Sequence, residues 1–487
     1  MKNGRRHFIK QTALAATAFV GWGFVPGQAG ASASAWTKIK GSVKSLGKGL
    51  AGIRVSDGIG VYLTDKNGRF EFLTNQRYVF MSYPAGFELA MLENGSVDFF
   101  RKVSLLQSEQ ELSFEIKPLA NSDLDHHFVV LADPQMQTPD EAALFDGESC
   151  ADLRQTIVHL APQHVFGIGC GDLVFDRFDL FDSYNRSLKS TGIPFFQVLG
   201  NHDIDLQARS NEEAQGPFQD QYGPAYYSFD RGKTHYVVLC DVFFLGNKQY
   251  YGYLSEVQLA WLELDLEGLE KGAELVVFLH IPAESEIVRL NPGRDPNKES
   301  LVNRQALYEI LEPYCAHLIS GHVHWNENRE VGHVFEHNTA AISGAWWSGP
   351  ICYDGTPKGY GVYRSENGKI SWYYKSIGQD AGHQFKAYPP GTGRDFADHY
   401  LVNVWNWDPR WDLEWLENGA VSGKPERVET YDPSAAKLYA ADMPKKQPWI
   451  SAQITGHIFV FKAINPQAAI IFRAKDRFGN VYEALIS

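Results

Sequence analysis

Five short motifs, each placed where a short apolar run ends, constrain this 487-residue chain more than any other feature. The run Phe128–Ala132, for example, ends directly before Asp133. In chain order the motifs are Asp133-Pro134-Gln135, Gly171-Asp172, Gly200-Asn201-His202-Asp203, His280 and Gly321-His322-Val323-His324. Polar side chains at successive strand ends can converge on one pocket, and mixed oxygen and nitrogen donors with one bridging carboxylate suit two divalent ions. The motifs therefore predict a two-metal hydrolase.

The order and residue types of these motifs resemble the calcineurin-like metallophosphoesterase superfamily. The resemblance implies two divalent metal ions (manganese, iron or zinc) bridged by Asp172. The other ligands that it implies are, for the first ion, Asp133, Gln135 and His324, and for the second ion, Asn201, His280 and His322. It also implies phosphoester hydrolysis by a metal-bridging hydroxide, with no covalent enzyme intermediate.

Each motif alone has an ordinary structural explanation. A lone His280 is more often a core histidine than a ligand, and Asp133 suits a helix cap. Gly321–His324 is more specific, because alternate residues of an extended segment point to the same side and bring both imidazoles to one cluster. Gly200–Asp203 is the most specific, since an amide ligand beside a histidine is rare outside this superfamily. The five motifs in the correct order argue against coincidence.

Two departures from the superfamily pattern bear on which metal the first site prefers and on which branch of the superfamily the chain resembles. The first motif is D-x-Q, where most relatives have D-x-H, and a glutamine oxygen is a harder and weaker donor than imidazole. This favours manganese or magnesium over zinc at the first site. It also leaves open whether Gln135 is a direct ligand. A D-x-Q variant occurs in relatives that cleave diphosphate-linked nucleotides. The spacing from Asp172 to Asp176 is one residue longer than in protein phosphatases, which argues against that branch.

His202 follows the amide ligand, so we expect its ring to lean over the pocket without binding metal. There it could protonate the leaving oxygen or hydrogen-bond to the phosphoryl group. An acidic neighbour would hold its tautomer, and both Asp203 and Asp176 qualify. The candidate catalytic residues are therefore His202, Asp203 and Asp176.

The first 35 residues are typical of a twin-arginine signal peptide. Arg5-Arg6 precedes the apolar stretch Ala13–Val25, which is shorter than the roughly 20 residues that span a bilayer, and small-residue cleavage sites follow. A membrane anchor is the alternative. We expect an exported protein, periplasmic or at the cell surface, with no transmembrane segment in the mature chain. Removal of these residues changes the formal charge from −13 to −17, which disfavours a long nucleic acid as substrate.

The pattern of apolar residues divides the rest of the chain into three parts. We expect a β-sandwich over residues 36–122 that resembles transthyretin-like modules, with a hairpin at Asn67-Gly68. Residues 123–345 alternate strand and helix, and the resemblance implies a four-layer αββα sandwich, so the fold class is α/β (α+β). A tryptophan-rich β-domain is expected over residues 346–487. The three-part layout resembles an exported bacterial subgroup of the superfamily.

Local signals place several elements within these parts. Helices are expected near residues 150–160 and 255–266, the second opened by a capping box at Ser255. A hairpin is expected over residues 226–241. Residues 283–299 read as a long loop that either rims the site or is a surface insertion. The segment 338–349 is expected either to place Ser343 or Trp346 near the pocket mouth or to form a domain connector. The five cysteines indicate no disulfide framework.

The ligand types do not encode the substrate. We expect a small phosphorylated substrate such as a nucleotide, a lipid headgroup or a glycan phosphate. D-x-Q and the absence of a recognisable monoester-binding arginine cluster favour a phosphodiester or a diphosphate over a phosphomonoester. The alternative is a cell-surface glycan-binding protein with a degenerate, non-catalytic scaffold, in which the C-terminal tryptophans form a sugar-stacking face. Tryptophans that alternate along strands are more often core residues.

Overall fold

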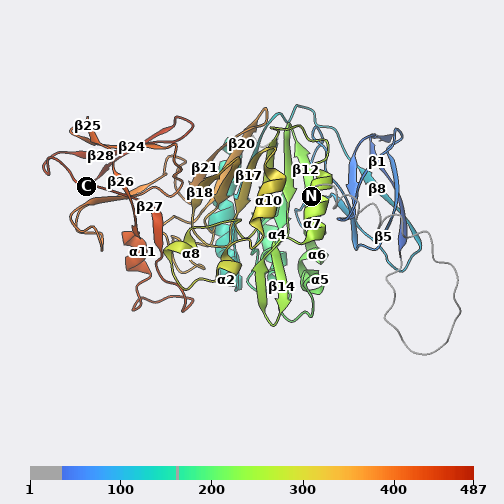
Figure 1. Ribbon diagram of the computed structural model, residues 1–487, viewed down its shortest axis with the longest axis horizontal. Helices are drawn as coiled ribbons and strands as arrows, with labels where there is room; N and C mark the ends of the chain where they lie inside the picture. Colours follow the sequence, from blue (N-terminus) through green and yellow to red (C-terminus); the bar gives the residue numbers. More distant parts are fainter. Residues whose placement is uncertain (1–35, 161–163, 487) are drawn as a thin grey trace.

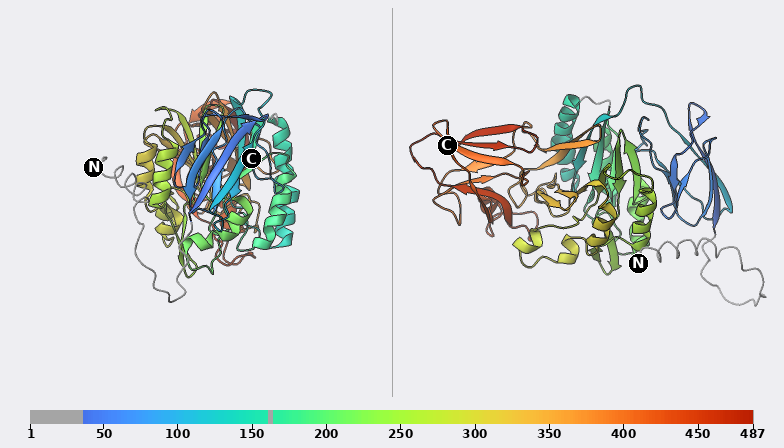
Figure 2. Two further views of the ribbon diagram at one scale, coloured as in Figure 1. Left: turned by 90° about the vertical axis from the view of Figure 1, so that its right-hand side faces the viewer. Right: turned by 45° about the horizontal axis from the view of Figure 1, so that its top comes forward.

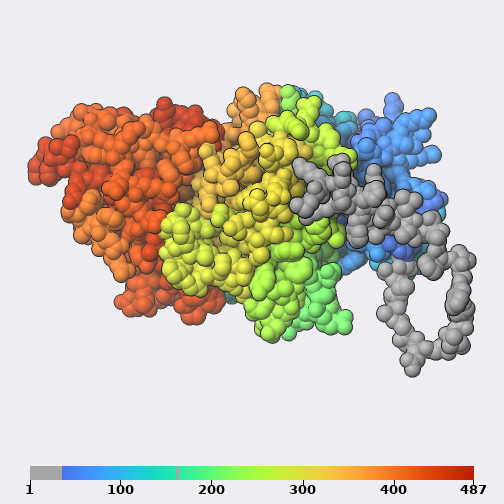
Figure 3. Space-filling view, viewed as in Figure 1, coloured from blue at the N-terminus to red at the C-terminus, as the bar shows by residue number. Residues whose placement is uncertain are grey.

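The computed structural model describes residues 36–160 and 164–486, so the expected signal peptide lies outside the described residues. Three blocks lie in a row along the longest axis of the molecule (Figures 1 and 3). The N-terminal residues form one end, a two-sheet sandwich forms the centre, and the C-terminal residues form the other end.

Two facing sheets form the centre. The first has the order β11-β10-β9-β20-β21 and the second β12-β13-β16-β17-β19-β18. Strands of the first sheet are β9 (Asp125–Leu131), β10 (Val165–Cys170), β11 (Phe195–Val198), β20 (Gly359–Glu366) and β21 (Lys369–Ser376). Strands of the second are β12 (Tyr227–Arg231), β13 (Thr234–Val238), β16 (Glu274–Phe278), β17 (Cys315–Ser320), β18 (Glu327–Val331) and β19 (Val334–Asn338). Every residue of β10 is buried and both its neighbours are parallel to it, which explains its continuous apolar run.

Aromatic side chains fill the space between the two sheets. The ring of Phe128 meets Tyr236 edge-on, with centroids 5.5 Å apart, and Phe278 at 5.9 Å. Phe166 also contacts Tyr236, at 5.4 Å. The β12–β13 hairpin that supplies Tyr236 has the predicted place, with Arg231 paired to Thr234.

Helices cover the outer faces of both sheets (Figure 2). The larger helices are α3 (Ala151–His159), α4 (Phe181–Lys189), α7 (Glu256–Asp265) and α10 (Arg304–Leu311). Leu153 of α3 packs in one buried cluster with Val129 of β9, and Trp261 of α7 packs in another with Val277 of β16. The predicted α/β fold with a four-layer αββα centre is thereby confirmed.

The predicted cap of α7 forms only in part. The Ser255 hydroxyl accepts from the Gln258 backbone N–H at 3.3 Å. The Gln258 side chain instead bonds the backbone N–H and carbonyl of Cys240, at 2.7 and 2.8 Å. Other elements of the centre are α2 (Pro139–Leu144), α5 (Asn211–Ala214), α6 (Gly216–Tyr222), β14 (Val242–Gly246), β15 (Gln249–Gly252), α8 (Ile287–Leu290) and α9 (Pro296–Glu299).

Two four-stranded sheets form the N-terminal block, β2-β1-β5 with β8 paired to β1, and β4-β3-β6-β7. Their strands are β1 (Thr37–Ser45), β2 (Lys48–Gly49), β3 (Arg54–Ser56), β4 (Val61–Leu63), β5 (Arg69–Thr74), β6 (Tyr78–Met81), β7 (Phe100–Lys102) and β8 (Glu109–Glu115). The hairpin prediction at Asn67-Gly68 is wrong, because β4 pairs with β3 whereas β5 pairs with β1. A tight turn does form, with the Gly68 N–H bonded to the Asp65 carbonyl at 2.9 Å, but it joins strands of two sheets.

The central sandwich extends past the boundary predicted at residue 345. β20 pairs antiparallel with β9, and β21 pairs with β20, so residues 359–376 belong to the first central sheet. Their apolar alternation suits a strand of either domain, and only the pairing with β9 decides between them. The C-terminal block therefore begins after β21.

Two further four-stranded sheets form the C-terminal block, β22-β23-β27-β26 and β25-β24-β28-β29. Its elements are β22 (Lys386–Tyr388), β23 (Tyr400–Asn403), β24 (Asp412–Glu417), β25 (Ala420–Gly423), β26 (Glu426–Tyr431), α11 (Pro433–Leu438), β27 (Ile454–Phe461), β28 (Ile470–Lys475) and β29 (Val481–Ile486). Trp405 and Trp411 are buried, as expected for core tryptophans, whereas Trp449 is 52% exposed.

The five cysteines are free thiols, and Cys170 and Cys240 are buried as predicted. Among the described residues, no helix combines the length and the apolar character that a membrane span requires.

Candidate metal centre

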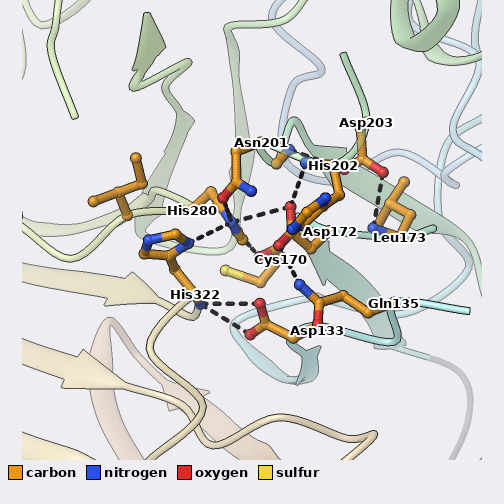
Figure 4. Close-up of polar contacts among 12 residues, drawn as sticks. Asp133, Gln135, Cys170, Asp172, Leu173, Asn201, His202, Asp203, His280 and His322 are labelled. Atoms are coloured by element: carbon orange, nitrogen blue, oxygen red, sulfur yellow. Dashed lines mark hydrogen bonds and ion pairs between the residues drawn. The ribbon is translucent and has the colours of Figure 1, made fainter. Parts of the chain in front are cut away.

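The residues singled out as ligands all follow strands of the two central sheets. Figure 4 shows how most of them lie together, namely Asp133, Gln135, Asp172, Asn201, His280 and His322. Asp133 and Gln135 follow β9, and Asp172 follows β10. Asn201 follows β11, while the second sheet supplies His280 after β16 and the pair His322 and His324 after β17. Neighbouring strands of each sheet are parallel here, so their carboxyl ends bring these side chains together.

Lone pairs converge on one point beside His280. Its Nδ1 donates to the Cys170 carbonyl at 3.1 Å, which leaves the lone pair on Nε2. This Nε2 lies 3.2 Å from Asn201 Oδ1, from Asp172 Oδ1 and from His322 Nδ1. Atoms of Asp172, His280 and His322 thus lie within 4.8 Å of one another. When the His280 ring is neutral, this set of acceptors suits a metal cation among them.

A second donor set lies on the other side of Asp172. His324 donates from Nδ1 to the Gly344 carbonyl at 2.9 Å, and its Nε2 is buried without a hydrogen-bond partner among the described residues, 3.6 Å from Asp133 Oδ1. The Oε1 of Gln135 is likewise buried, with no partner in the described part of the chain. Other buried side-chain atoms also lack partners there, but these two belong to residues predicted as ligands of one ion.

Asp172 joins the two sets. One carboxylate oxygen, Oδ1, faces His280, while Oδ2 accepts from the Gln135 amide. The carboxylate is 1% exposed. A buried carboxylate with one oxygen toward each set is the arrangement that a bridging ligand requires. The residues present therefore fit two divalent ions.

The electrostatics of the cluster also call for positive charge. Burial alone lowers the pKa of His280, but the carboxylates of Asp172 and Asp133 raise it to about 10. Burial and the charge of Asp172 raise the pKa of Asp133 to about 8. Burial lowers the pKa of His324 to about 3, which keeps its ring neutral and its lone pair available. Divalent ions would satisfy the carboxylates and leave the imidazoles as neutral donors.

The backbone at this edge is strained. Left-handed φ values occur at Asp133 (54°), Gln135 (42°), Asp172 (51°), His322 (71°) and His324 (50°), where residues with a Cβ are disfavoured. Such strain clusters at functional sites. Close packing explains why residue 200 is glycine, because a Cβ there would lie 2.0 Å from the backbone nitrogen of Asp172.

His202 lies beside this cluster, with about a fifth of its side chain exposed. Its Nδ1 lies 3.0 Å from Asp176 Oδ1, and its ring stacks on Phe175 with centroids 3.8 Å apart. Its backbone N–H donates to Asp172 Oδ1 at 2.8 Å. Burial lowers the pKa of His202, but Asp172 and Asp176 outweigh it and raise the pKa above the ordinary value.

The structure places Asp176, and not Asp203, as the carboxylate beside the ring of His202. Asp203 is fully buried, and its carboxylate accepts backbone N–H groups from Gly200, Leu173 and Val174 at 2.9–3.2 Å. It therefore ties the loop after β10 to the loop after β11. The catalytic assignment of Asp203 is corrected to a positioning role.

Several residues at the site escaped the sequence reasoning. Asp241 accepts from the backbone N–H groups of His280 and Ile281, at 3.2 and 2.8 Å. Asp241 follows β13 in the same way that the predicted ligands follow their strands. This position could have identified it as a site residue from the sequence. Glu299 has Oε2 at 3.9 Å from His322 Nε2, so the segment 283–299 rims the site and contains the short helices α8 and α9.

The segment after β19 contributes to the site as well. The Ser343 hydroxyl donates to the Asp133 carbonyl at 2.7 Å, and Trp346 stacks on His324 with centroids 4.1 Å apart. Ser343 and Trp346 therefore contact two of the predicted ligands, Asp133 and His324. Their segment helps to position the site and does not only connect two domains.

Comparison with known proteins agrees with this geometry. Residues 126–326 match the family model "Calcineurin-like phosphoesterase". Residues 37–119 match "N terminal of Calcineurin-like phosphoesterase" and residues 336–482 match "C terminal of Calcineurin-like phosphoesterase". The chain belongs to the calcineurin-like phosphoesterase family.

Individual similarities are weaker. Purple acid phosphatase 23 of Arabidopsis thaliana is 28% identical over 159 residues, 30% of this chain, which spans about a third (32%) of that relative. The purple acid phosphatase PPD1 of yellow lupin (Lupinus luteus) has a TM-score of 0.38 and 12% identity, over 61% of this chain and 56% of that one. A dimetal phosphatase from Danio rerio has a TM-score of 0.35 and 14% identity, over 51% of this chain and 98% of that one.

Proposed function

We propose that this protein is an exported phosphoesterase that hydrolyses a small phosphodiester or diphosphate with two divalent ions (manganese, iron or zinc). The observation that supports it most is the carboxylate of Asp172, which offers one oxygen to each donor set. Asp133, Gln135 and His324 would hold one ion, and Asn201, His280 and His322 the other. When bound, such ions neutralise charge on the phosphoryl oxygens and lower the pKa of water.

The protein's own groups would orient the substrate and move a proton. Asp176 holds His202 through Nδ1, which directs Nε2 away from that carboxylate. The two acidic neighbours favour the protonated ring, so His202 suits donation of a proton from Nε2 to the leaving oxygen. Asp203 and Asp241 fix the loops that carry Asn201 and His280. The alternative function, a glycan-binding scaffold without catalysis, is disfavoured by the near-complete donor set.

The preference for a diester or diphosphate rests on the D-x-Q motif and on the state of the arginine nearest the site. Gln135 stands where most relatives have histidine, and such a D-x-Q motif occurs in relatives that cleave diphosphate-linked nucleotides. Arg294, in the segment that rims the site, is paired with Glu299 at 3.1 Å, so its charge is already compensated. Because Arg294 is already paired, a doubly charged phosphomonoester lacks the free arginine that would stabilise it most.

The test is hydrolysis of a bis-aryl phosphodiester and of the matching aryl phosphomonoester by chelator-stripped protein resupplied with manganese, zinc or iron. We expect metal-dependent turnover, with the larger kcat/KM for the diester. A larger kcat/KM for the monoester with every metal would overturn the substrate preference. Tight metal binding without turnover of either compound would contradict the proposed activity on simple esters.

Export is proposed from the twin-arginine pattern at Arg5-Arg6. Replacement of both arginines by lysine should retain the full-length protein in the cytoplasm, as measured by cell fractionation and immunoblotting. Equal export of the wild-type and Arg5→Lys/Arg6→Lys chains would contradict this route.

A further inference from the structure

Two aromatic rings, Phe175 and Trp449, continue the stack that begins at His202. The ring of Phe175 stacks on His202 at an interplanar angle of 18°. The indole of Trp449 is nearly parallel to Phe175, at 14°, with ring centroids 6.5 Å apart. A planar group bound against Trp449 would continue the same set of parallel rings.

Trp449 also lies close to the other side of the metal centre. Its ring meets that of Trp346 edge-on, at 89° and 6.1 Å, and Trp346 in turn stacks on His324. Trp449 is therefore one ring removed from both His202 and His324. Its side chain is 52% exposed, whereas Trp346 is only partly exposed.

The C-terminal block holds this indole firmly at the rim of the catalytic domain. The Lys446 ammonium binds the buried Glu141 carboxylate at 2.9 Å, and the Gln447 amide donates to Gln137 Oε1 at 2.7 Å. Ile450 is 1% exposed and packs in a cluster with Trp325 and Tyr353. Residues on both sides of Trp449 are thus anchored, while the indole itself remains open to solvent.

We propose that Trp449, with Phe175 behind it, forms a stacking surface for a planar aromatic group attached to the substrate phosphate, such as a nucleobase. This inference rests on the proposed function and names a substrate class for it. The surface offers flat neutral rings in parallel planes, which suit stacking on another flat ring. The net negative charge of the chain disfavours binding of long polyanions. The substrate that suits this stacking surface is therefore a phosphoester about the size of a nucleotide.

The test compares three phosphate compounds as competitive inhibitors of diester hydrolysis. They are a nucleoside 5′-monophosphate, ribose 5-phosphate and methyl phosphate, which share the phosphate and differ in the attached group. We expect the nucleotide to bind the wild-type protein most tightly. Trp449→Ala should weaken nucleotide binding about tenfold and change the inhibition constants of the other two less than twofold. Trp449→Phe should keep most of the nucleotide affinity.

The matched control is Trp36→Ala, which removes another exposed indole (60% exposed) in the N-terminal block and should change none of the three constants. An unchanged nucleotide constant in Trp449→Ala would overturn the proposal. Equal losses for ribose 5-phosphate and the nucleotide would assign the surface to the sugar and also overturn it. If the protein hydrolyses no ester, quenching of indole fluorescence by the nucleotide tests the surface independently of the proposed activity.

Discussion

Replacing Asp172 by alanine is expected to abolish turnover, with a loss in kcat of about a thousandfold or more. The substitution removes an oxygen donor from each set and leaves the Gln135 amide and the His202 backbone N–H without their acceptor. It should also lower the bound metal below two ions per chain. The measurements are kcat on a bis-aryl phosphodiester and metal content by mass spectrometry.

Two companion variants separate charge from fold. Asp172→Asn keeps the size of the side chain but removes its charge, and we expect it to lose metal nearly as completely. Asp179→Ala removes an exposed carboxylate of the same segment that pairs with Arg177, and should leave both measurements unchanged. Retention of two tightly bound ions by Asp172→Ala, with a normal melting temperature, would disprove the bridging role.

Replacing His202 by alanine is the second large effect, and it should separate chemistry from metal binding. We expect the variant to retain both ions and to lose about 10²–10⁴-fold in kcat, the range for a general acid. The loss should be largest for alkyl esters, whose leaving oxygens need a proton, and smaller for nitrophenyl esters, whose leaving groups do not. Asp176→Asn should reproduce the same pattern to a lesser degree, since Asp176 holds the ring at 3.0 Å.

His159→Ala is the matched control, because this histidine is exposed near the end of α3, where its Nδ1 lies 2.7 Å from the Gln155 carbonyl of the same helix. Loss of metal in His202→Ala would make His202 a ligand. Equal losses for alkyl and nitrophenyl esters would exclude it as the acid and leave only a role in phosphoryl binding.

The order of the motifs made the centre of the molecule predictable from sequence, because each predicted ligand directly follows a buried strand. The β12–β13 hairpin and helix α7 were also predictable, because their turn and cap residues act on neighbouring residues of the chain. The turn at Asn67-Gly68 led to a wrong hairpin prediction, because the same turn residues can join two paired strands or two strands of different sheets. The end of the central sandwich was missed because the pairing of β20 with β9 joins segments more than 200 residues apart.

The sequence could not choose between Asp176 and Asp203 as the partner of His202. Both aspartates belong to segments that border the pocket. Which of them reaches His202 depends on the direction of the Asp176 side chain, which the left-handed backbone at that residue (φ of 55°) sets. No signal in the sequence set Trp449 apart from the other C-terminal tryptophans. Its position at the site depends on how the C-terminal block docks on the catalytic domain, and that docking rests on contacts such as Lys446 with Glu141.

The most direct test of the two-ion centre is a titration of chelator-stripped protein with manganese, following bound metal and diester turnover together. The account predicts that turnover rises to its maximum only as the bound metal approaches two ions per chain. It also predicts that Asp172→Asn shows no such rise. Full turnover with one ion bound, or turnover that ignores added metal, would contradict the central claim.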